Sequence, residues 1–247
     1  MTKLSRRVFL GSAPAAAAAA GIFGTFFSTA AEAAIKWNET YNVIVIGAGG
    51  AGLSAAVSAK EAGAKKVVVL EKMMFAGGNT IRAGGGFNAA IKADYKKAGI
   101  TDSPKLHAQQ TLAAGDGRGD PVLVHQLTEK APESVQWLKD HGVKFQDHIY
   151  QIYGGLYKRA RNPIGPRGGA YIKALLEVCK KEDIPILCNT RVVEIIREHQ
   201  LSGRVLGVKV EQKGGKTLYL RATNAVVAAA GGFAANDRLT AISDPRM

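Results

Sequence analysis

A glycine-rich turn between a strand and a helix is the sequence feature that most constrains how this chain can fold. Residues 41–57 read YNVIVIGAGGAGLSAAV, and the stretch 42–46, apolar from Val43 onward, is typical of a buried strand. The next residues, Gly47-Ala48-Gly49-Gly50-Ala51-Gly52, fit the pattern G-x-G-x-x-G and lead into a helix expected over about 51–62. In that pattern the first glycine makes a tight turn, the second lets the backbone approach a pyrophosphate, and the third lets the helix pack on the strand.

The position of an acidic residue indicates that this turn binds a dinucleotide. Glu71 directly follows a second apolar run, 67–70, and stands 19 residues beyond Gly52, where its carboxylate would accept hydrogen bonds from a ribose. The N–H groups and the positive dipole end at the helix start would hold the pyrophosphate. A purely structural glycine turn is the alternative, but the order of strand, turn, helix, strand and acid favours the dinucleotide.

The rest of the chain predicts an α/β domain. Ser103-Pro104 and Asp120-Pro121 have the composition of helix starts, and further helices are expected over about 132–140 and 168–182. Strands are expected near 185–189, 191–198, 204–212, 217–221 and 225–230, with glycines at the turns of a meander. We therefore predict a Rossmann-like domain over residues 34–247, in which a parallel βαβ unit is combined with a β-meander.

The first 33 residues are expected to be an export signal. They contain Ser5-Arg6-Arg7, then a long alanine-rich run, and they end in Ala31-Glu32-Ala33, a small-x-small cleavage site. The paired arginines resemble a twin-arginine signal, which predicts a periplasmic protein with no stable membrane insertion after cleavage. An uncleaved membrane anchor is the alternative, which Pro14 and the weak hydrophobicity of alanine and glycine disfavour.

Charge, cysteines and histidines limit the other function classes. The net charge of +13 comes from Lys and Arg spread along the chain without interleaved aromatic residues, which favours attraction of small anions over nucleic-acid binding. Cys179 and Cys188 are expected to be thiols, although an oxidising compartment would permit a disulfide. No Cys-x-x-Cys-His motif for covalent haem occurs, and the five histidines show no metal-ligand spacing, so no metal site is predicted.

A second glycine-rich loop indicates which dinucleotide binds. Residues 71–90 read EKMMFAGGNTIRAGGGFNAA, where a domain that binds only NAD would usually continue into a regular helix. The glycines at 77, 78 and 84–86 remove side chains where the backbone must lie close to something flat and bulky, which suits an isoalloxazine ring. FAD is therefore the expected cofactor.

With these motifs, the chain resembles the flavoprotein subunits of fumarate reductase and succinate dehydrogenase, especially the soluble periplasmic fumarate reductases of flavocytochrome c type. The resemblance covers 41–247. It rests on VIVIGAGGAGLSAAV, LEKMMFAGGNTIRAGGGFNAA, DPVLVHQLTEKAPESVQWLKDHGV, NTRVVEIIRE and AVVAAAGGFAAN. It implies the FAD-binding domain of the glutathione-reductase-like type.

The resemblance also implies a set of residues at the cofactor. Ala51 would lie at the pyrophosphate turn, Glu71 at the adenosine ribose, and Val192 at adenine. The remaining expected contacts are Gly47, Gly49, Gly50, Gly52, Lys72, Gly78, Asn79, Thr80, Ala83, Gly84, Gly85, Gly86, Ala230 and Gly231. Membrane-bound relatives attach FAD through a histidine at about the position of Asn79, and because asparagine cannot form that bond, the FAD is expected to be non-covalent.

The activity implied by the resemblance is hydride transfer from reduced flavin to the C=C bond of an unsaturated dicarboxylate, with electrons from a c-type cytochrome. The groups that hold and protonate the substrate belong to a capping domain and a final glycine-rich segment, which are expected beyond Met247. The chain is thus expected to be the N-terminal portion of such an enzyme, inactive alone, from a split or truncated reading frame. A reductase of another 2-enoate such as urocanate or methacrylate, and a non-catalytic FAD-binding fragment, remain alternatives, with a nicotinamide-dependent dehydrogenase a distant third.

A basic segment leaves two interpretations open. Residues 154–170 read GGLYKRARNPIGPRGGA, and periplasmic relatives often have a His-Arg-Pro run where this chain has Arg161-Asn162-Pro163. Arg159, Arg161 and Arg167 would either bind an acidic substrate or partner, or belong to a solvated basic loop.

Overall fold

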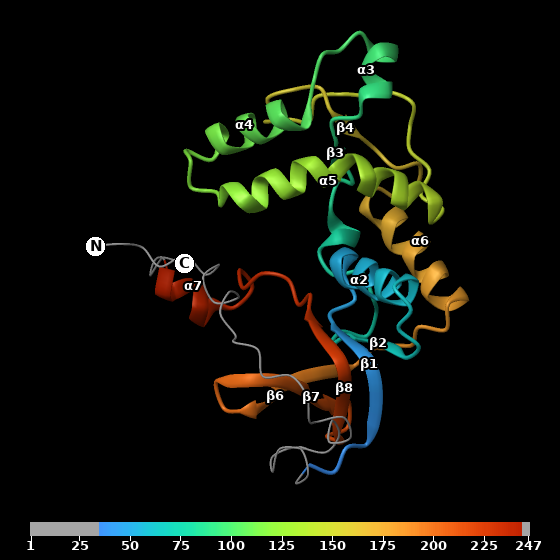
Figure 1. Cartoon of the computed structure of the whole chain (residues 1–247), viewed down its shortest axis with the longest axis vertical. Coiled ribbons are helices and arrows are strands. Elements are labelled where there is room, and N and C mark those ends of the chain that lie inside the picture. Colours follow the sequence, from blue (N-terminus) through green and yellow to red (C-terminus); the bar gives the residue numbers. More distant parts are fainter. Residues whose placement is uncertain (1–34, 244–247) are drawn as a thin grey trace, which may run out of the picture.

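The computed structural model describes residues 35–243, in which a β-sheet with helices against it lies below a layer of further helices (Figure 1). Residues 1–33, the expected export signal, lie outside the described part of the chain. Within that part, none of the helices combines the length and the apolar character that crossing a membrane requires.

The main sheet has the strand order β5-β2-β1-β8-β7-β6. Its parallel strands are β1 (Glu39–Ile46), β2 (Val67–Leu70), β5 (Ile186–Leu187) and β8 (Thr217–Ala228). The strands β6 (Thr190–His199) and β7 (Ser202–Gln212) join β8 in an antiparallel meander. The predicted α/β fold, a parallel βαβ unit combined with a meander, is therefore confirmed.

One predicted break in the meander is wrong. The sequence predicts separate strands at 217–221 and 225–230, whereas β8 runs without interruption from Thr217 to Ala228. The residues between the two predicted strands form a register shift within β8. Tyr41 of β1 lies opposite Ala222, whereas Val43 lies opposite Ala225. Such a β-bulge bends a strand without ending it.

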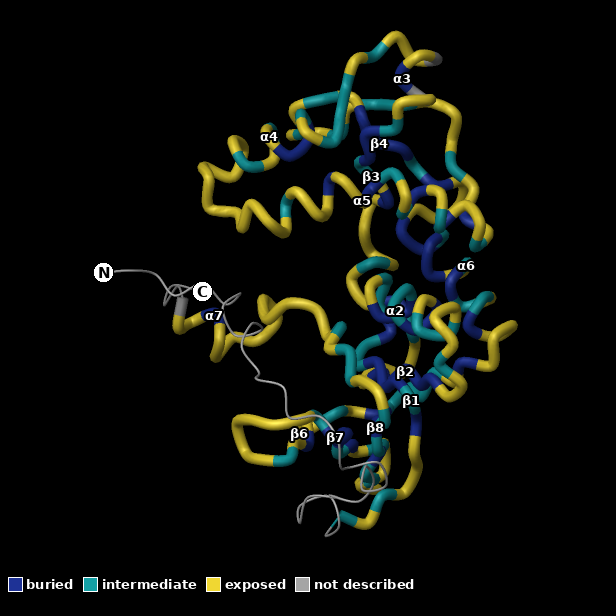
Figure 2. Tube along the Cα trace, in the orientation of Figure 1, coloured by how far each residue is buried: buried dark blue, intermediate teal, exposed yellow. Residues whose placement is uncertain are grey.

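Strand β1 is buried on both of its faces because its side chains alternate between two cores. Val43 and Val45 pack with helices α2 (Gly50–Glu61) and α6 (Gly168–Lys181) in one core. Ile44 packs with the meander in the other. Figure 2 shows buried residues along β1, β2 and α2. The carboxyl end of β1 and the start of α2 are thus fixed by core packing on two sides.

The upper layer contains α3 (Lys92–Ala98), α4 (Pro104–Ala114), α5 (Pro121–Asp140) and a small antiparallel pair, β3 (Phe87–Asn88) with β4 (Ala160–Arg161). Two short helices, η2 (Thr80–Arg82) and α7 (Asp237–Ser243), complete the described elements. The predicted helix starts are confirmed: the Ser103 hydroxyl accepts from the Leu106 N–H at 3.0 Å, and the Asp120 carboxylate accepts from the Val122 N–H at 2.8 Å.

The helix predicted over about 132–140 is only the second half of α5. The helix begins at Pro121 and includes Pro132 in its interior. The sequence favours a helix start at the second proline, since an internal proline removes one backbone hydrogen bond. Burial of Thr128, Ala131 and Val135 on one side of α5 stabilises the helix through this position.

Candidate cofactor site

The first glycine loop joins β1 to α2, and two of its glycines are required by the protein itself. Gly47 has φ of +103°, and a Cβ there would lie 2.5 Å from the carbonyl oxygen of Ala229. A Cβ on Gly52 would lie 1.8 Å from the carbonyl oxygen of Gly47. Gly47 is therefore required by the conformation of the turn, and Gly52 by the close packing of the helix on the strand. Both requirements hold whether or not a ligand binds nearby.

Gly49 is different, because nothing in the described protein requires a glycine there. Its φ of −81° and ψ of −176° are open to any residue, and a Cβ would come no nearer than 3.9 Å to another protein atom. The space next to its α-carbon is therefore open at the start of α2, with the Gly77 carbonyl oxygen and the Gly78 α-carbon at its edge. A backbone left bare in this way fits a site that a pyrophosphate group approaches closely.

The start of α2 also offers hydrogen-bond donors. The helix has no acidic residue in its first turn and no side-chain cap at Gly49, and the first N–H groups of a helix lack intrahelical partners. The Gly50 N–H donates to the Thr80 hydroxyl at 3.1 Å, so a polar side chain of the second loop meets the helix end. Ala51 is exposed next to it. This end of the helix can bind an anion.

Glu71 lies at the carboxyl end of β2 and is 7% exposed. Its two oxygens accept hydrogen bonds from the N–H groups of Ala48 at 2.8 Å and Met73 at 2.9 Å. These bonds fix the carboxylate beside the first glycine loop. Each carboxylate oxygen keeps a further lone-pair site, so Glu71 can still accept from a ligand hydroxyl.

A cavity of about 250 Å³ brings together predicted site residues from four separate segments of the chain. The predicted residues that line it are Gly47, Glu71, Lys72, Val192 and Ala230. Sequence reasoning missed Thr190 and Arg191, which also line it. Only their position just before Val192 in β6 could have indicated them.

The second glycine loop lies directly against the first. The Gly77 N–H donates to the Ala48 carbonyl at 2.8 Å, and Gly49 and Gly77 form a parallel bridge. Gly78 has φ of +52°, and a Cβ there would lie 3.2 Å from the α-carbon of Gly49. Asn79 follows, exposed, at the start of η2. The two loops thus form one continuous backbone surface at the carboxyl ends of β1 and β2.

Residues 83–86 continue from this surface toward the upper layer. A Cβ on Gly85 would lie 2.8 Å from the Arg167 backbone, and one on Gly86 would lie 2.7 Å from the Tyr150 hydroxyl, so packing restricts both positions. A Cβ on Gly84 would meet no protein atom within 4 Å, and Ala83 is exposed. The four residues do not line the 250 Å³ cavity.

The carboxyl end of β8 lies next to the carboxyl end of β1. The Ala229 N–H donates to the Ile46 carbonyl at 2.9 Å, which holds the residues after β8 next to the first glycine loop. Gly231 has φ of +81°, and no protein atom lies within 4 Å of where its Cβ would be. Ala230 and Gly231 are therefore placed at the edge of the same surface as Gly47.

The basic segment is not a solvated loop throughout. Arg159 is 4% exposed and binds Asp102 through two 2.9 Å hydrogen bonds, and it also donates to Gln110 at 2.6 Å. Arg161 is 2% exposed and donates to the Ala89 carbonyl at 2.8 Å. The interpretation as a solvated loop is wrong for both and holds only for Arg167, which is exposed. Arg159 is committed to a structural ion pair.

Both cysteines are free thiols in the structure. Burial raises the pKa of Cys179 to about 11, so this thiol stays protonated at neutral pH. Burial also raises the pKa of Cys188, with a smaller contribution from the Glu71 carboxylate. In residues 35–243, no group of three or more His, Cys, Asp or Glu side chains is arranged to hold a metal ion.

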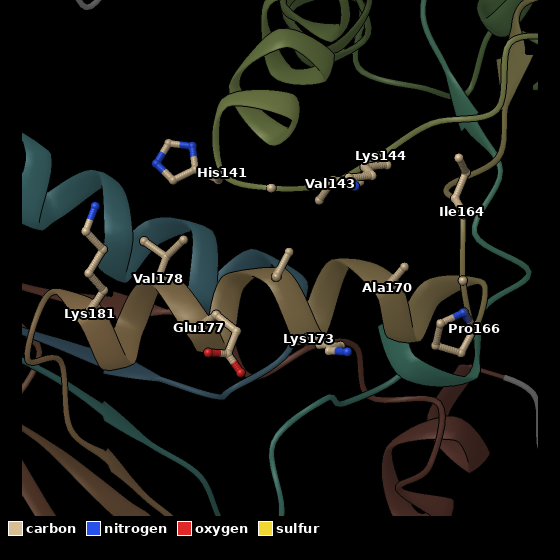
Figure 3. A pocket seen from close by; sticks show the side chains of 13 residues that line it. His141, Val143, Lys144, Ile164, Pro166, Ala170, Lys173, Glu177, Val178 and Lys181 are labelled. Carbon is tan, nitrogen blue, oxygen red and sulfur yellow. The ribbon is translucent and has the colours of Figure 1, made fainter.

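A cavity of about 580 Å³ lies away from the glycine loops, along the outer face of α6 (Figure 3). Ala170 and Val178 of α6 face residues 141–144 across it, and Ile164 and Pro166 lie at one end. None of the predicted cofactor residues lines this cavity. Its apolar walls and lysine-containing rim do not extend the cofactor site.

Comparisons with known proteins agree with this geometry. A family model described as an FAD binding domain matches residues 42–246. The chain is 37% identical over 212 residues to a fumarate reductase (cytochrome) of Shewanella frigidimarina, covering 85% of this chain and 36% of that protein. It is 35% identical over 208 residues to a urocanate reductase of Eggerthella lenta, covering 83% of this chain and 34% of that protein.

A solved structure shares the fold. The open conformation of a flavocytochrome c3 fumarate reductase has a TM-score of 0.79 and 31% identity to this chain, covering 85% of this chain and 37% of that one. The chain spans about a third of the length of these two curated relatives. Because the family model covers most of its residues and the fold agrees, the chain belongs to the FAD-binding domain family, with fumarate reductases of flavocytochrome type among its relatives.

Proposed function

We propose that this chain provides the FAD-binding part of a reductase that transfers a hydride from reduced flavin to the C=C bond of an unsaturated carboxylate. The observation that carries the proposal is Gly49, a glycine that neither backbone conformation nor packing requires, at a helix start with free donor capacity. Its neighbours are a fixed carboxylate, Glu71, and a second bare backbone loop. These are the features that a flavin dinucleotide needs.

In this proposal each group of residues has a distinct role. The amides at Gly49 and Ala51 bind the pyrophosphate, while the Gly50 N–H donates to the Thr80 hydroxyl. Thr80 and Asn79 lie beside the pyrophosphate toward the ribityl chain. Glu71 accepts from the adenosine ribose, while the Val192 backbone meets adenine in the 250 Å³ cavity. The remaining predicted residues of the two loops and the end of β8 line the dinucleotide and leave room for it. Bound FAD supplies the hydride.

We propose that the FAD is held without a covalent bond. Asn79 occupies the position at which membrane-bound relatives carry the attaching histidine, and a carboxamide is not a nucleophile. Precipitating the FAD-loaded protein with acid should leave the yellow flavin in the supernatant. Flavin that stays in the pellet would overturn this point.

The names of two relatives support a substrate class and an electron donor for this chain. One relative is named for fumarate and a cytochrome and another for urocanate, which supports a 2-enoate substrate for this chain and a c-type cytochrome as donor. The sequence Ser5-Arg6-Arg7 supports export to the periplasm by the twin-arginine route. Replacing both arginines by lysine should leave an uncleaved precursor in the cytoplasm, and unchanged export of that variant would contradict the assignment.

We further propose that the 247 residues bind FAD but do not reduce a substrate alone. The chain covers 36% of the fumarate reductase (cytochrome) that it matches. Arg159, a buried arginine of the upper layer, is bound to Asp102. The groups that hold the carboxylates would then come from another polypeptide region or a separate chain. Purified protein loaded with FAD should show flavin absorption bands yet leave reduced viologen unoxidised when fumarate or urocanate is added.

The two arms of this experiment test different claims. Absence of flavin bands after incubation with FAD would refute FAD binding and, with it, the proposed function. Oxidation of viologen that depends on the added enoate would support the reductase and overturn the claim that the chain alone is inactive.

A further inference from the structure

The cavity of about 580 Å³ along the outer face of α6 has the size and shape of a ligand site, and we call it the α6 cavity (Figure 3). Cavities that hold small molecules have volumes of about 300–1,000 Å³. The residues of α6 that line it extend from Ala170 to Lys181, which is about 16 Å along the helix axis. Residues 141–144 form the opposite wall. The cavity therefore suits an elongated molecule.

The walls of the α6 cavity are largely apolar. Ala170, Ala174 and Val178 follow one another at intervals of four residues and so lie on one face of α6. Val143 lies in the opposite wall and is 4% exposed. Ile164, at one end, is 58% exposed although it lines a concave surface. A hydrocarbon segment that covered these side chains would remove apolar surface from water, which is favourable.

The charged residues of the cavity are distributed unevenly along it. Lys144 lies at one end, while His141 and Lys181 lie at the other (Figure 3). Lys181 has an acidic neighbour, because Glu177 is one helical turn away on α6. His141 is bound to the carboxylate of Glu61 at 2.9 Å. The positive charges at the α6 carboxyl end are thus offset by carboxylates of the protein.

Lys144 differs from these residues, because no acidic side chain lines the cavity at its end. The other lysine of the lining, Lys173, is four residues from Glu177 on α6, so its charge is also offset. In the described part of the chain, no carboxylate lies within ion-pair distance of the Lys144 ammonium group. The end of the cavity at Lys144 is therefore where an anionic group is attracted most strongly.

We propose that the α6 cavity binds an elongated apolar carboxylate, with the carboxylate at Lys144 and the hydrocarbon chain along Ala170, Ala174 and Val178. One unmatched cation at one end of an apolar cavity selects a ligand with a single anionic group. This site goes beyond the proposed function, because none of the predicted cofactor residues lines the cavity.

Two pairs of probes test the proposal on the 247-residue chain, with binding measured by calorimetry and by the shift in thermal midpoint. Decanoate and octanoate differ by two methylene groups, so decanoate should bind about tenfold more tightly if the hydrocarbon chain is buried in the cavity. Octanoate and octan-1-ol differ in the charged group. Octanoate should bind about threefold more tightly than the alcohol, as expected for an ion pair with an exposed lysine.

Variants locate the binding site. Ala170→Leu places a larger side chain in the cavity and should weaken decanoate binding at least tenfold, whereas Ala113→Leu, at an exposed position of α4 outside the cavity, should not change it. Lys144→Met should remove the preference for octanoate over octan-1-ol while the alcohol still binds. Lys180→Met removes the same charge from an exposed position of α6 outside the cavity and should keep the preference.

Four results would overturn the proposal. They are no binding of decanoate, equal affinity for decanoate and octanoate, a preference for octanoate that persists in Lys144→Met, and unchanged decanoate binding in Ala170→Leu. The first two need no variant that folds. Displacement of decanoate by FAD would place the probe in the cofactor site and would also contradict the proposal, which predicts that the two bind independently.

The same samples separate this proposal from the proposed function. A chain that takes up no FAD but binds decanoate with the expected preferences would refute the proposed function and retain the α6 cavity as a carboxylate site. A chain that takes up FAD but shows no such preferences would refute the carboxylate site and retain the proposed function.

Discussion

Replacing Gly49 by alanine should abolish tight FAD binding while leaving the fold intact. The added methyl group meets no protein atom within 3.9 Å, and the backbone conformation is open to alanine. Gly49 is the N-cap of α2, where alanine is less favourable than glycine by about 1 kcal/mol at most, which corresponds to roughly 2–4 °C in thermal midpoint for a chain of this size. The methyl group would, however, occupy space that the pyrophosphate needs.

The expected loss of affinity can be bounded. If the methyl group displaces the pyrophosphate from a single N–H donor, the loss is about 1.5–3 kcal/mol, or tenfold to more than a hundredfold in Kd. The assay is a titration of apoprotein with FAD followed by quenching of flavin fluorescence, with the thermal midpoint measured on the same samples. Wild-type affinity in Gly49→Ala would refute the assignment of this glycine to the cofactor.

Two further glycine variants serve as controls for this result. Gly52→Ala should lose the fold itself, since its Cβ would lie 1.8 Å from the Gly47 carbonyl oxygen. Gly119→Ala should change neither property, because its Cβ would make ordinary contacts of 3.4 Å and longer with Val124 and Leu112 of the upper layer. A Gly52→Ala protein that folds normally would show that the close approach of α2 to the Gly47 carbonyl is wrong.

Three other predictions concern side chains. Glu71→Gln should weaken FAD binding about tenfold and lower the free energy of unfolding by about 1–2 kcal/mol. The reason is that the NH2 group of an amide cannot accept a hydrogen bond, whereas both oxygens of the Glu71 carboxylate do. Unchanged values in FAD titration and in urea unfolding would contradict this. Asp102→Asn should lower the free energy of unfolding, measured in urea, by about 3–5 kcal/mol, because it leaves Arg159 buried without a counter-charge. Adding Arg159→Met to this variant should recover part of the lost stability. Losses that simply add in the double variant would argue against the ion pair. Cys179, with its pKa raised to about 11 by burial, should resist thiol reagents at pH 8 until the protein unfolds. Its contribution to stability is complete below pH 9 and is lost as pH rises through 11, because the unfolded thiol ionises first; a Cys179→Ala variant with the same alkaline loss of stability would exclude this cause.

The local parts of the site could be predicted from sequence because neighbouring residues determine them. The strand ending at Ile46, the turn Gly47–Gly52 and the acid at Glu71 follow one another within a single βαβ unit, and the structure has all three where they were expected. The apolar run 67–70 is buried along its whole length, as a central parallel strand must be. Sequence could not, however, separate glycines needed for packing, such as Gly52, from Gly49, whose surroundings are open.

The features that sequence did not reveal depend on residues far apart in the chain. Arg159 is buried because Asp102, 57 residues earlier, is placed against it. The two-residue strands β3 and β4 exist only as partners of each other, and neither run has the length of a recognisable strand. Thr190 and Arg191 reach the 250 Å³ cavity because β5, which directly precedes them in the chain, pairs with β2, and no local pattern indicates this pairing.

The two prolines of α5 also show that a local sequence pattern does not by itself determine where a helix begins. Pro121 follows Asp120 and Pro132 follows Ala131, and only Pro121 begins a helix. The cap at Asp120 distinguishes the first proline, while the buried side of α5 carries the helix past the second. Tertiary packing overrides local preference here.

The bare backbone of the two adjacent glycine loops, with Glu71 beside them, is proposed to bind FAD without a covalent bond, and the proposed reductase function depends on this binding. The most direct test is to titrate the purified, flavin-free 247-residue chain with FAD and to follow both the flavin spectrum and the release of flavin by acid. We predict saturable uptake of a single FAD per chain, with an affinity at least about tenfold weaker in Gly49→Ala, and release of all of the flavin on acid denaturation. A chain that remains colourless at saturating FAD, or that binds FAD equally well with alanine at position 49, would contradict it.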